Sequence, residues 1–198
     1  ILHECTQITL QNSASRLRGE ETQTPLVFLK EVIEANHELA GFISKLTSLE
    51  GKELSQLNNI LHTLDHVNQC ATEASNPELL QACNRIPELQ KRSEHLAQLF
   101  LLGAQALSDK EPPYPSAVAE QLGNAIQYSS DARPKILQSI LDKQLALEDA
   151  LFALNAQRRL EQLTLHAVRA LHYLEKLSLD KTHISNITEL DTSKLSSS

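Results

Sequence analysis

Residues 52–74 read KELSQLNNILHTLDHVNQCATEA, and they carry the clearest secondary-structure signal in the chain. Apolar side chains recur three and four residues apart along this stretch, while polar and charged side chains fill the positions between them. This spacing matches the 3.6-residue period of an amphipathic α-helix. The apolar stripe consists of Leu54, Leu57, Ile60, Leu61, Leu64, Val67, Ala71 and Ala74. We therefore expect a long helix that packs this stripe into a core.

Two further helices are predicted before this stretch. Residues 1–18 carry apolar side chains at helical spacing and are followed by Gly19, a residue type that favours helix C-termini. Residues 25–51 continue the same period, and Thr24 and Pro25 supply the N-cap and the first helical position. The N-terminal part of the chain is therefore expected to form three consecutive helices.

Prolines divide the middle of the chain. Asn76 and Pro77 repeat the pattern of an N-cap and a first helical position. Pro87 is expected to kink or restart the helix that they begin, because proline lacks a backbone N–H. Beyond it the apolar arc broadens over residues 89–107, which indicates a central helix covered on several sides. Residues 108–115 are rich in proline and are the natural place for a boundary within the fold.

The longest periodic segment lies near the C-terminus. It follows a short predicted helix around residues 118–126, begins at Pro134 and extends to about residue 179. The phase of its apolar stripe changes near residues 155–159, which predicts a bend, a break or a coiled-coil stutter there. Before that point the stripe consists of Leu137, Ile140, Leu147, Leu151 and Leu154. Residues 180–198 are rich in Ser and Thr, and we expect a flexible polar tail.

These patterns together predict an all-α fold. We expect an antiparallel bundle of about five to six helices, formed by residues 1–179 as a single domain. The composition agrees, since aromatic residues make up only 4% of the chain and it has only five glycines. A β-sandwich or barrel normally needs more β-branched and aromatic residues and more turn residues.

Charge and hydropathy exclude two classes of partner. A net charge of -7 leaves no attraction for phosphate backbones, so no nucleic acid is expected to bind. No run approaches 18 apolar residues, so no transmembrane helix is expected within these residues. Because the chain begins with Ile1 and lacks Met, we expect a piece of a longer protein whose targeting signals lie elsewhere.

The motifs of common enzyme classes are missing from the sequence. The glycines are isolated, which leaves no phosphate-cradling loop, and no Gly-x-Ser-x-Gly motif occurs. We therefore assign no catalytic, metal-binding or cofactor-binding residue and expect a protein that is not an enzyme. An enzyme with inward-facing Glu34, His37, His95 or His166 remains the least favoured hypothesis.

Two pairs of residues, one of two histidines and one of a glutamate and a histidine, have metal-ligand spacing but lack a complete ligand set. His62 and His66 are four residues apart and share a helix face, as in some zinc sites. The leucine stripe faces the core, however, so we expect both imidazoles to project toward solvent. Glu34 and His37 match one Glu-x-x-His copy of a di-iron bundle, but such bundles need two copies. We therefore interpret both pairs as ordinary polar residues.

Asn36 is a candidate register or ligand residue, because it places an amide between Leu29 and Ile43 on an apolar stripe. An edge position, hydrogen-bonded to water or a carbonyl, is the favoured interpretation.

Cys70 and Cys83 are a candidate disulfide. They lie equally far from the turn at residues 76–77, so antiparallel helices would bring them opposite one another. A bridge needs Cα atoms within about 7 Å and would stabilise the fold by about 3 kcal/mol. Two buried free thiols are the favoured alternative. Cys5 is unpaired in either case.

We expect a non-enzymatic module that binds a partner protein, or a second copy of itself, through its helix faces. Exposed leucines along residues 134–179 would favour this function. The alternative is an extracytoplasmic sensor or small-ligand-binding bundle of a larger membrane-anchored protein, which a bridge between Cys70 and Cys83 would favour. The sequence does not determine the compartment, although a cytoplasmic location is slightly favoured without the bridge.

Overall fold

The computed structural model describes residues 2–20, 34, 41, 51–108, 115–129, 132–142 and 146–195. Within these residues the chain forms seven α-helices and no strand. The helices are α1 (Leu2–Leu17), α3 (Lys52–Ala74), α4 (Pro77–Arg85), α5 (Pro87–Ser108), α6 (Pro115–Ser129), α7 (Ala132–Leu141) and α8 (Leu147–Leu195). The predicted all-α class is confirmed, and the number of helices exceeds the five to six expected. The helix predicted over residues 25–51 lies outside the described residues, except that Glu34 and Gly41 are helical.

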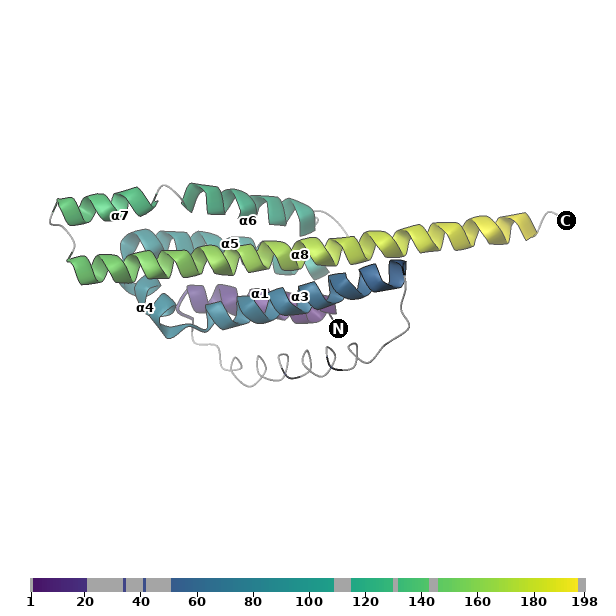
Figure 1. Ribbon diagram of the computed structural model, residues 1–198, viewed down its shortest axis with the longest axis horizontal. Helices are drawn as coiled ribbons and strands as arrows, with labels where there is room; N and C mark the ends of the chain where they lie inside the picture. Colours follow the sequence, from purple (N-terminus) through teal and green to yellow (C-terminus); the bar gives the residue numbers. More distant parts are fainter. Residues whose placement is uncertain are drawn as a thin grey trace.

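Antiparallel neighbours build the bundle (Figure 1). Helix α8 packs against α3 and α6, and both of these run in the opposite direction to it. Helix α1 packs against α5, again antiparallel, and also against α3. With 49 residues, α8 is about 74 Å long at 1.5 Å per residue, and its C-terminal part continues beyond the ends of α3 and α6 in Figure 1. The last helix therefore projects from the bundle.

The ends of several helices lie where the sequence predicts them. Asn76 caps α4, since its side-chain Oδ1 accepts a hydrogen bond from the backbone N–H of Leu79 at 2.9 Å. Ile86 is extended, as a residue before proline prefers to be, and Pro87 starts α5. Gly19, with φ of 69°, follows the C-terminus of α1. The predicted kink or restart at Pro87 is thus a restart.

The long C-terminal segment differs from the prediction in where it breaks. Residues 155–159 lie inside the continuous helix α8, and the interruption instead separates α7 from α8. Helix α8 also continues to Leu195, so the helix does not end at residue 180, where the sequence predicted that a flexible tail begins.

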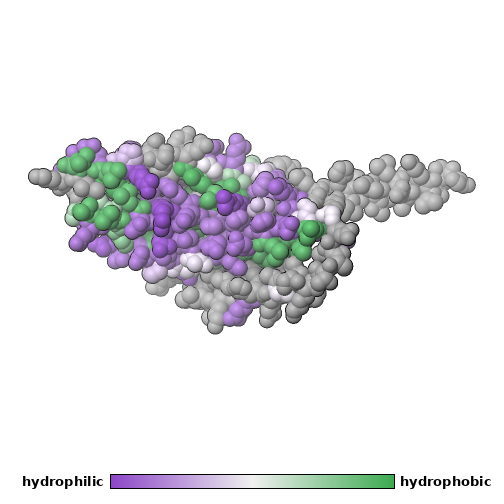
Figure 2. All heavy atoms as spheres, viewed as in Figure 1, coloured by the Kyte–Doolittle hydropathy of each residue, from purple (hydrophilic) through white to green (hydrophobic). Residues whose placement is uncertain are grey.

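The apparent change of phase in α8 arises because alanines, and not leucines, face the core at its start. The buried face consists of Ala150, Ala153, Ala156, Gln157, Leu160, Leu163, Thr164, Ala167, Ala170, Leu171 and Leu174. These positions keep a spacing of three and four residues without a slip. The predicted stripe positions Leu147 and Leu151 are exposed. Figure 2 shows hydrophobic residues on the surface at the end of the molecule where α7 and the start of α8 lie.

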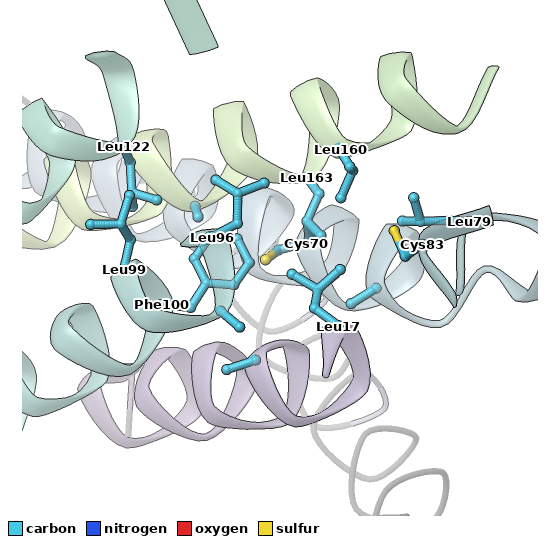
Figure 3. Packing of buried hydrophobic residues seen from close by; sticks show 14 of the residues in the cluster. Leu17, Cys70, Leu79, Cys83, Leu96, Leu99, Phe100, Leu122, Leu160 and Leu163 are labelled. Atoms are coloured by element: carbon cyan, nitrogen blue, oxygen red, sulfur yellow. The ribbon is translucent and has the colours of Figure 1, made fainter. Parts of the chain in front are cut away.

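One apolar cluster joins all seven described helices. It includes Phe100 of α5, which is fully buried; Figure 3 shows it among the other residues of the cluster. Leu122 of α6 belongs to the same cluster, so the core continues across the proline-rich connection at residues 108–115. The core positions predicted at Leu64 and Leu99 are confirmed.

Candidate functional site

Exposed leucines gather at the end of the bundle formed by α7 and the beginning of α8. We call this set the leucine patch; its members are Leu137 (46% exposed), Leu141 (74%), Leu147 (62%) and Leu151 (53%). On each helix the two leucines are four residues apart and therefore share a face. The two helices pack against each other. The patch is therefore contributed by two neighbouring helices at one end of the molecule.

Charged side chains flank the patch. Arg133 on α7 and Glu148 and Asp149 at the start of α8 are exposed. Asp142 follows α7, and its Oδ1 accepts a hydrogen bond from Gln138 Nε2 at 2.9 Å. An apolar centre with a polar rim is the usual composition of a protein-binding surface.

A pair of histidines joins α3 to α8 away from the leucine patch. His66 is only 7% exposed, and its Nδ1 lies 3.1 Å from Nδ1 of His166, which is half-buried. Burial lowers the pKa of both imidazoles, because each leaves water that would solvate its charged form. Both rings are therefore biased toward the neutral state.

Tyr173 of α8 extends this pair into an aromatic group. Its ring stacks on His62 with centroids 4.8 Å apart and an interplanar angle of 20°. The ring of His66 lies 5.8 Å from Tyr173 at 16°. Lys176 Nζ stands 5.4 Å from the centroid of the tyrosine ring. The polar side chains between α3 and α8 are therefore packed against one another.

The expectation that both His62 and His66 project toward solvent is wrong for His66. His62 is exposed, but His66 is buried. Helix α3 packs against both α1 and α8, so its covered arc is wider than the leucine stripe alone indicates. The sequence holds no local signal for this contact, since His66 and His166 are 100 residues apart.

The charged residues near this contact include one ion pair between the same helices. Arg159 Nη1 of α8 donates to Glu73 Oε2 of α3 at 3.0 Å, with both side chains partly shielded. Arg92 of α5 is partly buried, and burial lowers its pKa while Glu161 raises it. These charges support the packing of α8 and form no cluster with the leucine patch.

The candidate disulfide between Cys70 and Cys83 is absent from the structure, where the two thiols contact different helices. Cys5, Cys70 and Cys83 are all free. Cys70 Sγ lies 3.9 Å from Ser13 Oγ of α1, whereas the side chain that acts on the pKa of the Cys83 thiol is Ser93 of α5. Figure 3 shows the two sulfur atoms well apart.

Burial makes both core thiols poor nucleophiles. It raises the pKa of Cys70 from 9.0 to about 12 and that of Cys83 from 9.0 to about 11. They therefore behave as small apolar side chains, which is the alternative that the sequence favoured.

The remaining candidate residues do not converge on one site. Asn36 and His37 lie outside the described residues. Glu34 and His95 are exposed, so neither faces inward as the enzyme hypothesis requires. In the part of the chain that the structure describes, no group of three or more His, Cys, Asp or Glu side chains is arranged to hold a metal ion. No described helix is long and apolar enough to cross a membrane.

Comparison with known proteins gives no relative. No protein family, no curated protein and no solved structure matches this chain.

Proposed function

We propose that this chain is a non-enzymatic helical-bundle module that binds a partner protein through its helix faces, and that the leucine patch is the binding surface. The observation that carries the proposal is the exposure of Leu141 and Leu147, at 74% and 62%. Leucine side chains are usually buried, and exposed apolar side chains that lie together often belong to interaction sites.

The arrangement of the patch favours a helical partner. The packed helices α7 and α8 both carry exposed leucines, and exposed leucines on neighbouring helices can contact the apolar face of a third helix. Exposed Arg133 on α7 and exposed Glu148 and Asp149 on α8 supply charges of both signs for orienting it. A second copy of this chain offers the same chemistry, so self-association is an outcome that the experiment distinguishes.

The experiment uses the double variant Leu141→Glu, Leu147→Glu. Both side chains are exposed, so the substitutions are expected to change stability by less than about 0.5 kcal/mol each. Wild-type and variant chains are used as baits in cells, with quantitative mass spectrometry of bound proteins, and their masses in solution are measured by light scattering. The wild type should retain a partner, or form a dimer, that the double variant loses.

Leu54→Glu is the matched control. Leu54 is 46% exposed but lies on α3, outside the leucine patch. It should bind like the wild type. Equal binding by wild type and double variant, with unchanged melting temperatures, would contradict the proposed surface.

A further inference from the structure

The contact between α3 and α8 contains an arrangement that responds to protons. Nδ1 of His66 faces Nδ1 of His166 at 3.1 Å. At this distance one nitrogen must carry the hydrogen and the other must accept it through its lone pair. A neutral pair satisfies this requirement. A pair with one additional proton also satisfies it, because that proton binds to Nε2 of the imidazole whose Nδ1 donates. When both imidazoles are charged, however, both Nδ1 atoms carry hydrogens, and the hydrogen bond is replaced by repulsion.

We propose that His66 and His166 form a proton-sensitive latch, which keeps α3 and α8 together while at least one imidazole is neutral and releases them when both are protonated. The geometry supports release of this contact in particular, because His66 is only 7% exposed and lies where α3 packs against α8, so a movement of α3 relative to α8 brings its charged ring into water. The aromatic ring of Tyr173 is stacked beside His66 and further restricts rotation of the His66 ring out of the contact.

The charged groups around the pair act in both directions. On α3, Asp65 Oδ2 lies 3.9 Å from His66 Nδ1 and favours the first proton, and Glu73 also favours protonation of His166. His62 disfavours charge on His66. On α8, Arg169 disfavours charge on both imidazoles. Asp65 favours charge on both imidazoles, but it is exposed and screened by water, and the pKa of both imidazoles stays below the ordinary value.

The direction of the pH dependence follows from linkage. Both imidazoles have a pKa below their ordinary value of 6.5 in the folded chain. The unfolded or opened state therefore binds more protons, and stability is lost as pH falls below 6.5 until the folded pKa is passed. The equilibrium constant for opening rises about tenfold per pH unit for each proton taken up.

The test is amide hydrogen exchange of the whole chain at pH 7.5 and pH 5.5, corrected for intrinsic exchange rates. Peptides covering residues 61–70 and 162–173 should lose at least about tenfold more protection at the lower pH than peptides covering residues 89–100 of α5. Equal loss in all helices would overturn the latch, because it would indicate general acid unfolding.

A variant isolates the second positive charge. His166→Gln keeps a side chain that hydrogen-bonds to His66 but cannot be protonated, so the additional loss of protection in the α3–α8 contact should decrease at least about tenfold. His95→Gln, at an exposed histidine of α5, is the matched control and should keep the wild-type response. An unchanged response in His166→Gln would overturn the proposal.

Two further measurements cover other outcomes. If His166→Gln does not fold, the ring resonances of the wild type are followed by NMR, and His66 and His166 should titrate in coupled steps below 6.5. Independent titration without a change of the α3–α8 contact would contradict the latch. A pH response that disappears after treatment with EDTA would overturn it as well, since a metal ion would then be the bound species.

Discussion

Leu99 and Leu102 lie three residues apart on α5, yet their environments are opposite. Leu99 is 5% exposed and belongs to the core, whereas Leu102 is 39% exposed. Helical phase predicts burial at both positions, because the apolar arc of α5 is broad. The side chains packed around each leucine decide whether it is buried. Because the two leucines differ in burial, a substitution at Leu102 serves as the control for the same substitution at Leu99.

Leu99→Asp should unfold the protein or lower its melting temperature by roughly 10 °C or more. An unpaired carboxylate in the core costs about 4 kcal/mol or more. Leu102→Asp should have a small effect, since that carboxylate reaches water. The pair Leu64→Asp and Leu54→Asp on α3 repeats the comparison, with Leu64 buried and Leu54 exposed. Melting is followed by circular dichroism, and equal melting temperatures within either pair would show that the burial is wrongly placed.

At the scale of a helix, α8 shows that the largest apolar side chains of a helix are not always the ones that face the core. Leucines are the strongest apolar signal in the sequence, which therefore predicts Leu147 and Leu151 on its inner face. In the fold that face is formed by alanines such as Ala150 and Ala153, which are fully buried. Small side chains there are consistent with a close approach of α8 to its neighbours.

Ala153→Leu should destabilise the protein by about 1–3 kcal/mol, because a larger side chain does not fit a packed face. Leu151→Ala should change the stability by less than about 0.5 kcal/mol, because this leucine is exposed. Denaturant titrations of the two variants give both values. A larger loss in Leu151→Ala than in Ala153→Leu would restore the leucine-inward phase that the sequence alone indicates.

At the scale of the whole molecule, α8 connects the parts of the bundle. It packs against α3 through the histidine pair and the ion pair of Arg159 with Glu73, and it packs against α6 on another side. Its first turns contribute to the leucine patch, and its C-terminal part projects beyond the bundle (Figure 1). Helix α8 therefore contributes to both the proposed binding surface and the proposed latch.

The chain should unfold in a single cooperative transition, because the apolar cluster includes residues on both sides of the proline-rich connection at residues 108–115. In calorimetry the measured enthalpy of unfolding should equal the van't Hoff enthalpy. Two resolved transitions would instead place a domain boundary at this connection.

The sequence by itself determined the all-α class and the points where several helices begin and end. These features are local: a 3.6-residue period, the side chain of Asn76, the missing N–H of Pro87 and the positive φ available to Gly19 act within a few residues. They can be predicted from the sequence without knowledge of which helices pack together.

Only the tertiary structure decided where the covered face of a helix departs from its leucine stripe. Burial of His66 depends on His166, 100 residues away, and the separation of Cys70 from Cys83 depends on their contacts with α1 and α5. Exposure of the leucine patch likewise depends on where the other helices end. The environment of a side chain is set by contacts between helices that are distant in sequence. A single sequence does not show which residues of those helices meet.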